Sequence, residues 1–271
     1  MEKKFKLGVI GGGFMSYSIV SGALAANFLS ANEILVSDVN ASSLNKFTDK
    51  GVAVTLSNSE VLNQSEFVLF AVKPQNFIGS IGEIKNISCK KLISIMAGVK
   101  KSTIKSALNI ADVKVARCMP NTPCSVGNGA VGIDLSDYDN ASDRDFIGNL
   151  FSSFAKVVFV DESKLNAVTG ISGSSPAYFY LFIKCLVEAG VKQGLSYEDA
   201  KSLAANTMIG SGKMIFENAD KSLDELITAV CSKGGTTIEA IKVFNECDLA
   251  GIADKAVSAC VKRAEELENL S

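Results

Sequence analysis

The sequence predicts an α/β fold: an N-terminal, doubly wound and mainly parallel β-sheet, followed by an all-α domain. Three observations predict it. The chain opens with an apolar run, Phe5–Ile10, that breaks into three consecutive glycines and then into a helical pattern. Apolar runs alternate with helical patterns over roughly the first 160 residues, as in a parallel sheet with helices on both faces. Only helical patterns follow, so we expect one domain over residues 1–160 and a second over 161–271.

The first element is a buried strand followed by a glycine turn and a helix over residues 14–29. Rossmann-type turns that bind dinucleotides have the pattern G-x-G-x-x-G, with glycines for the tight turn, for approach of the pyrophosphate and for helix packing. Gly11 and Gly13 fill the first two positions, and Ser16 stands in the third. This turn predicts a nucleotide cofactor, although alone it is equally compatible with a turn that binds nothing.

The second strand, Glu33–Ser37, ends in Asp38, which lies 22 residues after Ser16. An acidic residue about 20 residues after the glycine turn accepts a hydrogen bond from the ribose 2′-hydroxyl of NAD. Its charge repels the 2′-phosphate of NADPH, and no lysine or arginine follows before Lys46. The sequence therefore favours NADH. The alternative is that Asp38 only caps the next helix.

Five further strands are expected, at 67–72, 91–95, 113–118, 130–133 and 156–160. Ligands of such sheets bind beyond the carboxyl ends of the strands. Two of these ends carry small residues and a proline, at 71–74 and 97–99, where a cofactor's ribose and nicotinamide could lie close to the backbone. Ordinary loop residues remain an alternative at either end.

Composition limits the possible partners. The 27 basic and 29 acidic residues nearly cancel and form no basic stripe, so we expect neither nucleic acid nor an anionic membrane as partner. The uncharged stretch 7–32 is interrupted by five glycines and four serines, so we expect no membrane anchor there. Seven cysteines without a CxxC pair favour reduced thiols in the cytoplasm. The absence of histidine excludes the usual zinc ligand sets, and we expect no metal.

The second domain begins with Ser174, Ser175 and Pro176, which predict a helix start. The helix that follows, 176–194, is apolar nearly all round, so we expect part of it to be buried by another subunit. Further helices are expected to start at Ser196 and at Ser222, the latter with a capping box to Glu225. The segments 236–246 and 249–270 complete the expected bundle.

A second candidate site lies in this helical half. Gly234 and Gly235, followed by Thr236 and Thr237, open an amphipathic helix. The free N–H groups and the positive dipole end of such a helix suit an anion such as a carboxylate. An unoccupied helix cap is the alternative.

Several motifs together resemble pyrroline-5-carboxylate reductases, and their order along the chain matches that family nearly end to end. They are GVIGGGFM at 8–15, AVKPQ at 71–75, MAGV at 96–99, ARCMPNTPCSVGNG at 116–129, TGISGSSPAY at 169–178 and SKGGTTIEAI at 232–241. The resemblance implies reduction of 1-pyrroline-5-carboxylate to L-proline with NAD(P)H, the last step of proline biosynthesis. It also implies a Rossmann domain and a helical domain that interlocks into a homodimer, with dimers often forming decamers.

The same resemblance implies roles for individual residues. The implied cofactor contacts are Ile10, Gly11, Gly12, Gly13, Phe14, Met15, Asn58, Ala71, Val72, Lys73, Pro74, Met96, Ala97 and Gly98. The implied substrate contacts are Glu162, Ser232, Gly235, Thr236 and Thr237, with the glycine–threonine turn supplied by the partner subunit. We expect Thr237 to be the catalytic residue, because its hydroxyl can hydrogen-bond the ring nitrogen and orient the imine.

Two departures and three alternatives qualify this expectation. The family usually has a polar residue in place of Phe14 and proline in place of Lys233. A hydroxyacid dehydrogenase is one alternative, but Lys164 and Asn166 do not reproduce the spacing of its catalytic pair. A reductase of another cyclic imine and a catalytically idle paralogue that binds the cofactor as a regulator are the others.

Overall fold

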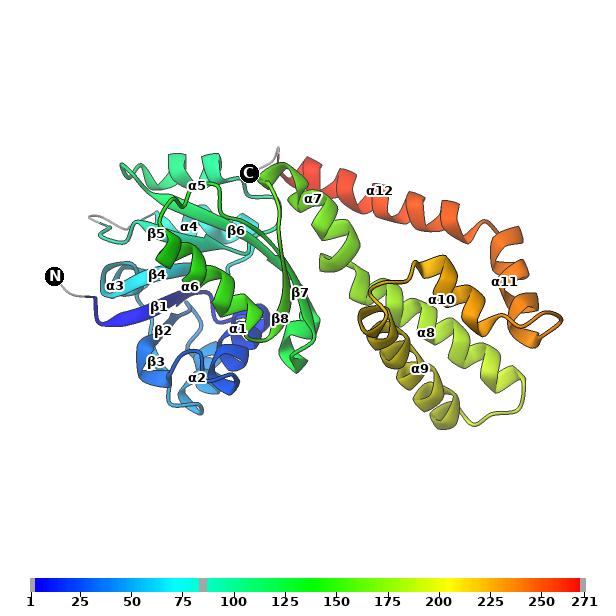
Figure 1. The fold of residues 1–271 in the computed structure, drawn as a ribbon. Coiled ribbons are helices and arrows are strands. Elements are labelled where there is room, and N and C mark those ends of the chain that lie inside the picture. Colours follow the sequence, from blue (N-terminus) through cyan, green and yellow to red (C-terminus); the bar gives the residue numbers. More distant parts are fainter. Residues whose placement is uncertain (1–2, 83–86, 269–271) are drawn as a thin grey trace. The chain divides into compact units, whose positions relative to one another are not determined.

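The computed structural model describes residues 3–82 and 87–268 (Figure 1). The chain forms two compact units, one of Met1–Pro176 with Ala259–Ser271 and one of Ala177–Ser258. The first unit contains the β-sheet and the second is helical. The predicted domain boundary at 160/161 lies just beyond the last strand, which ends at Phe159, and stays a prediction.

The sheet has eight strands in the order β3-β2-β1-β4-β5-β6-β7-β8. Every neighbouring pair is parallel except β6 and β7, so the predicted doubly wound, mainly parallel sheet is confirmed. The strands are β1 (Phe5–Ile10), β2 (Ile34–Ser37), β3 (Ala53–Thr55), β4 (Ser65–Phe70), β5 (Lys91–Ser94), β6 (Lys114–Pro120), β7 (Gly129–Asp134) and β8 (Ala155–Phe159).

Helices cover both faces of the sheet (Figure 1). Buried apolar residues of α1, α2 and α6 form one core against the sheet, and those of α3, α4 and α5 form the other. These helices are α1 (Phe14–Ala25), α2 (Asn45–Thr48), α3 (Asn58–Gln64), α4 (Phe77–Ile81), α5 (Lys101–Leu108) and α6 (Ala141–Ser152), and α7 (Leu165–Val168) follows β8. Burial of both faces explains why central strands such as β1 and β4 consist of nearly continuous apolar runs rather than alternating patterns.

The register of the central strands determines where a ligand can bind. Ile10, the last residue of β1, lies beside Ser37 of β2 and Phe70 of β4, which are the last residues of their strands. Gly11, Asp38 and Ala71 therefore follow three adjacent strand ends. This edge is where parallel sheets bind their ligands.

The first helix is shorter than predicted. It ends at Ala25 rather than at residue 29, because Asn27 takes a left-handed conformation with φ 54°. Asparagine tolerates this conformation and commonly ends helices in it.

The helical unit contains α8 (Ser175–Lys192), whose first two residues belong to the sheet unit, then α9 (Tyr197–Glu217), α10 (Leu223–Val230), α11 (Thr236–Glu246) and α12 (Leu249–Glu268), which ends in the sheet unit. The predicted starts are confirmed: Ser196 accepts from the N–H of Asp199, and Ser222 and Glu225 form the capping box. Residues 269 and 270 of the predicted last helix lie outside the described residues.

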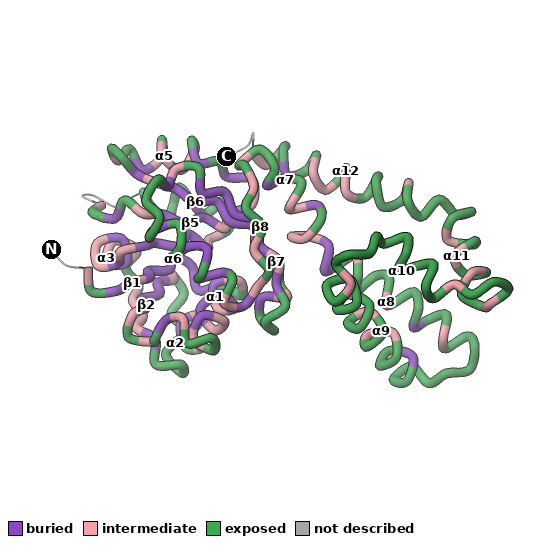
Figure 2. Tube along the Cα trace, in the orientation of Figure 1, coloured by how far each residue is buried: buried purple, intermediate pink, exposed green. Residues whose placement is uncertain are grey.

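Residues of the helical unit are mostly exposed in a single chain (Figure 2), and many of the exposed residues are large and apolar. Only Val187 and Ala200 are buried among residues 177–258, all of which are described. The exposed set includes Phe179, Tyr180, Leu181, Leu203, Ile209, Met214, Ile215, Phe216, Leu223, Val230 and Val243. A surface of this kind marks an interaction site. No helix in the described part of the chain is long and apolar enough to cross a membrane.

Candidate functional site

The glycine turn after β1 is shaped so that only glycine fits its first position. Gly11 has φ +107°, and a Cβ there would lie 2.7 Å from the carbonyl oxygen of Ala71. Its N–H donates to the carbonyl of Ser37 at 2.8 Å, which ties the turn to β2. Gly13 is the N-cap of α1, and no side chain of the described residues caps this helix. The N–H groups of its first turn can therefore bind an anion, as a dinucleotide pyrophosphate requires.

Ser16 at the third motif position is accommodated inside the helix. Its buried hydroxyl donates to the carbonyl of Gly13 at 3.0 Å. Further along α1, Gly22 permits another close contact, because a Cβ there would lie 2.5 Å from the ring of Phe154. The departure from the motif therefore leaves the geometry of the turn intact.

Asp38 lies against the glycine turn. Its Oδ2 accepts from the N–H of Gly12 at 2.7 Å, and its Oδ1 accepts from the N–H of Asn40 at 2.8 Å. The N-cap of the next helical turn is Asn40, whose side chain accepts from the N–H of Ser42. The carboxylate is thus fixed beside the turn, and each oxygen keeps a further lone pair for a hydroxyl donor.

Lys46 also reaches this turn, although it lies 33 residues after Gly13 in the sequence. Its Nζ donates to the carbonyl of Gly13 at 3.2 Å and lies 5.3 Å from the centre of the Tyr17 ring. A cation is therefore present beside Gly13, although no basic residue lies between Asp38 and Lys46 in the sequence.

The remaining candidate cofactor contacts lie after β4, after β5, and at the starts of α3 and α1. The N–H of Ala71 donates to the carbonyl of Ile10 at 2.8 Å, and Pro74 opens a short 3₁₀ turn after Lys73. Gly98 takes a left-handed conformation with φ +71°. Asn58 accepts from the hydroxyl of Ser37 at 2.7 Å and donates to the carbonyl of Ser80 at 2.9 Å, so its amide braces the end of β2. Phe14 and Met15 are the first residues of α1, with Phe14 exposed.

The glycine–threonine turn lies in the helical unit. Gly234 has φ +71°, and the N–H of Gly235 donates to the carbonyl of Ser232 at 2.9 Å. Gly235 is the N-cap of α11, and none of the described side chains caps it. Thr236 and Thr237 follow as the first, exposed residues of the helix. The helix start is confirmed, and its use as an anion site stays a prediction.

Glu162, an expected substrate contact, belongs to a buried charge cluster in the sheet unit. Its Oε1 accepts from the main-chain N–H of Lys101 at 2.8 Å and from Nη1 of Arg117 at 3.0 Å. Arg117 lies on β6 with only 2% of its surface exposed. Arg117 has no role in the motifs described above, although a charge inside the apolar run VARCM indicates that it needs a buried partner.

The same cluster continues around Lys101. Burial disfavours its charge, but the hydrogen bond and charge of Asp134, together with Asp137 and Glu162, outweigh burial and raise the pKa of Lys101. Lys101 therefore stays charged and anchors the start of α5 to the end of β7.

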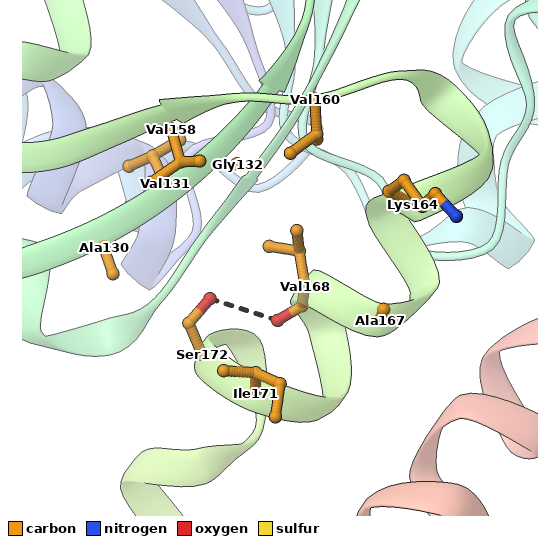
Figure 3. A pocket seen from close by; sticks show the side chains of 10 residues that line it. All are labelled: Ala130, Val131, Gly132, Val158, Val160, Lys164, Ala167, Val168, Ile171 and Ser172. Carbon is orange, nitrogen blue, oxygen red and sulfur yellow. Dashed lines mark hydrogen bonds between the residues drawn. The ribbon is translucent and has the colours of Figure 1, made fainter. Parts of the chain in front are cut away.

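A pocket of about 450 Å³ lies between β7, β8 and a π-helical turn at Thr169–Gly173 (Figure 3). The ten residues that line it are apolar except for Lys164 and Ser172. Ser172 donates to the carbonyl of Val168 at 3.1 Å, and its own carbonyl accepts from the side chain of Asn121 at 3.1 Å. None of the candidate cofactor or substrate residues lines this pocket. The described residues also contain no cluster of histidine, cysteine and acidic groups suited to a metal ion.

Together the sheet and the glycine turn define a dinucleotide-binding protein of the Rossmann class with an appended helical domain. The chain belongs to the pyrroline-5-carboxylate reductase family. The family model for dimerisation of pyrroline-5-carboxylate reductase matches residues 162–267, and the model for F420-dependent NADP oxidoreductases matches residues 6–98.

Curated relatives and solved structures agree with this assignment over the whole chain. The chain is 35% identical to a pyrroline-5-carboxylate reductase of Vibrio alginolyticus, covering 100% of both chains. It is 36% identical to that of Haemophilus influenzae, covering 96% of this chain and 97% of the relative. The structure of the Coxiella burnetii reductase matches with a TM-score of 0.89 at 33% identity, covering 98% of this chain and 99% of that one. The NADP-bound Plasmodium falciparum reductase matches with a TM-score of 0.87 at 28% identity, covering 99% and 100%.

Proposed function

We propose that this chain is a pyrroline-5-carboxylate reductase, which uses NAD(P)H to reduce the C=N bond of 1-pyrroline-5-carboxylate and gives L-proline. One observation carries the proposal: a chain of this family has both a glycine turn that fits a dinucleotide and an uncapped α11 N-terminus suited to a carboxylate. An oxidoreductase of this substrate needs both, because the cyclic imine carries a carboxylate on its ring.

The residues present fit a dinucleotide. Gly13, where a Cβ would meet no described atom within 4 Å, leaves the backbone approachable, and the first turn of α1 presents N–H groups to a pyrophosphate. When bound, NAD(P)H supplies the hydride. The contacts proposed along its length are Ile10 to Met15 for the pyrophosphate, Asn58 for the nicotinamide ribose, and Ala71 to Pro74 with Met96 to Gly98 for the nicotinamide end.

We propose NADH as the preferred cofactor. Asp38 is held by Gly12 and Asn40 in a position to accept from a ribose hydroxyl, and its charge opposes a 2′-phosphate. Lys46 contributes a positive charge at the same turn, so it partly offsets this repulsion and keeps NADPH usable.

The proposed substrate contacts position the imine. N–H groups at Gly235 to Thr237 bind the carboxylate, and the Thr237 hydroxyl hydrogen-bonds the ring nitrogen so that the imine carbon faces the cofactor. An imine nitrogen is basic enough to be protonated by water, so no histidine is needed. Thr236 lies within this turn, and Ser232, whose carbonyl accepts from the N–H of Gly235, precedes it. Glu162 stays a predicted substrate contact, with its Oε1 already shared by Lys101 and Arg117.

The chain is also proposed to act as a homodimer through its helical domain, residues 161–271, with decamers as a further level of assembly. The exposed apolar surface of residues 177–258 and the match to the dimerisation model support the dimer. In that dimer the glycine–threonine turn of one copy serves the dinucleotide bound by the other. The cytoplasmic location expected from the cysteines stays a prediction.

The test is an assay of the purified chain with 1-pyrroline-5-carboxylate and either NADH or NADPH, followed by absorbance of the reduced cofactor. Thr237→Ala should lower turnover roughly 10- to 1,000-fold, the effect of losing one positioned donor. Thr228→Ala is the matched control, because the Thr228 hydroxyl donates to the carbonyl of Asp224 within α10. Oxidation of neither cofactor would refute the proposal, and cofactor binding without turnover would indicate the catalytically idle paralogue instead.

A further inference from the structure

The end of α12 lies directly against the turn that follows β5. A Cβ on Gly98 would lie 2.8 Å from Cβ of Leu267 and 3.3 Å from its carbonyl carbon. The left-handed backbone of Gly98 and this close approach both exclude a larger residue. All these atoms belong to the sheet unit, because the chain returns to it at Ala259.

Glu268, the next residue, fixes this contact through charge. Its Oε1 accepts from Nη1 of Arg117 at 3.2 Å, and its Oε2 lies 3.5 Å from Nζ of Lys100. The side chains of Arg117 and Glu268 are 2% and 9% exposed, so solvent screens this pair weakly, whereas Lys100 is 46% exposed and its pair is screened more. Lys100 stands two residues after Gly98, so Leu267 and Glu268 hold the same turn at two points.

Arg117 joins this contact to a second one on the same turn. Its Nη1 also donates to Oε1 of Glu162, which in turn accepts from the N–H of Lys101. One guanidinium therefore holds both the segment that leaves β8 and the end of α12 against the start of α5. Nη2 of Arg117 is buried and has no hydrogen-bond partner among the described residues. The carboxylates of Glu162 and Glu268 on Nη1 are therefore the main stabilisation of this buried positive charge.

We infer that Glu268 and Arg117 are positioning residues for the dinucleotide: they set the Met96–Gly98 turn that lines its nicotinamide end. The inference rests on the proposed function, since that function places the cofactor on this turn. The charges of Arg117, Lys100, Glu162 and Glu268 cancel formally, so removing Glu268 leaves a buried cation underpaired and frees the turn. A turn displaced by a fraction of an ångström binds its ligand less well. Because this turn lines the dinucleotide, we expect the affinity for the dinucleotide to fall and the affinity for the imine to stay the same.

The test compares Glu268→Ala with Glu265→Ala. Glu265 is exposed on the same helix, and its replacement by alanine changes the helix propensity by the same amount. Binding of NADH and NADPH to the full chain is measured by fluorescence of the reduced nicotinamide, without substrate, beside steady-state KM values and thermal unfolding. We expect Glu268→Ala to weaken dinucleotide binding about 3- to 30-fold, the range of a coupling through one contact network. Glu162, the predicted substrate contact in this network, keeps its hydrogen bonds from Arg117 and Lys101 in this variant, so the KM for the imine should stay within about twofold. Glu265→Ala should match the wild type.

Two further variants separate positioning from folding. Glu268→Gln keeps an acceptor for Arg117 and should recover part of the dinucleotide affinity that Glu268→Ala loses. Leu267→Ala should weaken dinucleotide binding although all four charged side chains of the network remain. A lower unfolding temperature with unchanged dinucleotide affinity in Glu268→Ala would overturn the inference, as would an equal rise in both KM values. If the wild type binds neither dinucleotide, the proposed function itself fails, which is a different result.

Discussion

The main-chain N–H of Gly12 donates a 2.7 Å hydrogen bond to Oδ2 of Asp38, which joins the glycine turn to the end of the second strand. The bond fixes the carboxylate where the adenosine ribose of a dinucleotide is expected. Mutation can separate the observed role of Asp38, holding the turn, from its proposed role, selecting the cofactor.

Asp38→Asn should change cofactor choice and leave the turn in place. The asparagine carbonyl accepts from Gly12 while the hydrogen bond from Asn40 is lost, and the negative charge proposed to oppose a 2′-phosphate is gone. We expect the kcat/KM ratio of NADPH to NADH to rise about 10- to 100-fold, because like-charge contacts cost several kcal/mol. Initial rates with both cofactors give this ratio.

Two variants control this prediction. Asp49→Asn removes an exposed charge at the end of α2 and should leave the ratio unchanged. Lys46→Met removes the cation beside Gly13 and should lower the ratio. An unchanged ratio in Asp38→Asn would show that this carboxylate does not face the ribose.

Gly11→Ala should destabilise the fold and abolish dinucleotide binding, whereas Gly13→Ala should leave the fold intact. A Cβ on Gly11 meets the carbonyl of Ala71 at a positive φ, while a Cβ on Gly13 meets no described atom within 4 Å. Strain of this kind costs about 1–3 kcal/mol in the free energy of unfolding. Urea unfolding of both variants measures the difference, and equal stabilities would contradict the geometry of the turn.

Much of the fold was predictable because burial on both faces makes central strands continuously apolar. β1 was predicted with its observed limits, and β4 was displaced by two residues. β3 (Ala53–Thr55) was missed, since three half-buried residues give no periodic signal. The antiparallel direction of β7 was also beyond reach, because pairing direction depends on neighbours rather than on local pattern.

The candidate site was also predictable only in part. The glycine turn and Asp38 were found because they form a local motif with a fixed spacing. Arg117 was overlooked because its partners Glu162 and Glu268 lie 45 and 151 residues further along the chain. The proximity of Lys46 to the glycine turn was missed for a related reason. Lys46 lies on α2, and the fold brings its ammonium group to the carbonyl of Gly13.

The buried charge cluster predicts a pH dependence of stability. Burial raises the pKa of Asp137, but the hydrogen bonds from Lys105 and Val115, with the charge of Lys101, outweigh burial and leave the pKa below its ordinary value. A carboxyl whose pKa is lower in the folded state stabilises the protein above its unfolded pKa of about 3.9. That stabilisation is lost as pH falls through the folded pKa.

Asp137→Asn should therefore lower the free energy of unfolding by about 1.5–3 kcal/mol at pH 7, the contribution of a hydrogen bond to a charged group. The difference from the wild type should shrink below about pH 4, as the carboxyl of the wild type becomes protonated. Asp220→Asn, an exposed change in the helical unit, is the control and should show no such trend. A difference that is constant from pH 7 to pH 3 would contradict the assigned role.

Mixed dimers test whether each active site combines two copies of the chain. Gly13→Glu fits sterically but places a carboxylate at the proposed pyrophosphate site, and Thr237→Ala removes the proposed substrate hydroxyl. If one copy's turn serves the other copy's dinucleotide, refolding the two variants together should restore about a quarter of wild-type activity. Half of the dimers are then mixed, and one of the two sites in each mixed dimer is intact.

A second mixture combines the double variant Gly13→Glu/Thr237→Ala with an equal amount of wild type, so that both defects lie on one copy of the chain. Sites shared between copies leave activity only in wild-type dimers, about a quarter of all sites, because each mixed dimer has one defect in each site. Sites contained in one chain leave about half of the sites active and give no recovery when the single variants are mixed. Activity per total chain, measured beside the oligomeric state of each mixture, therefore decides between the two arrangements.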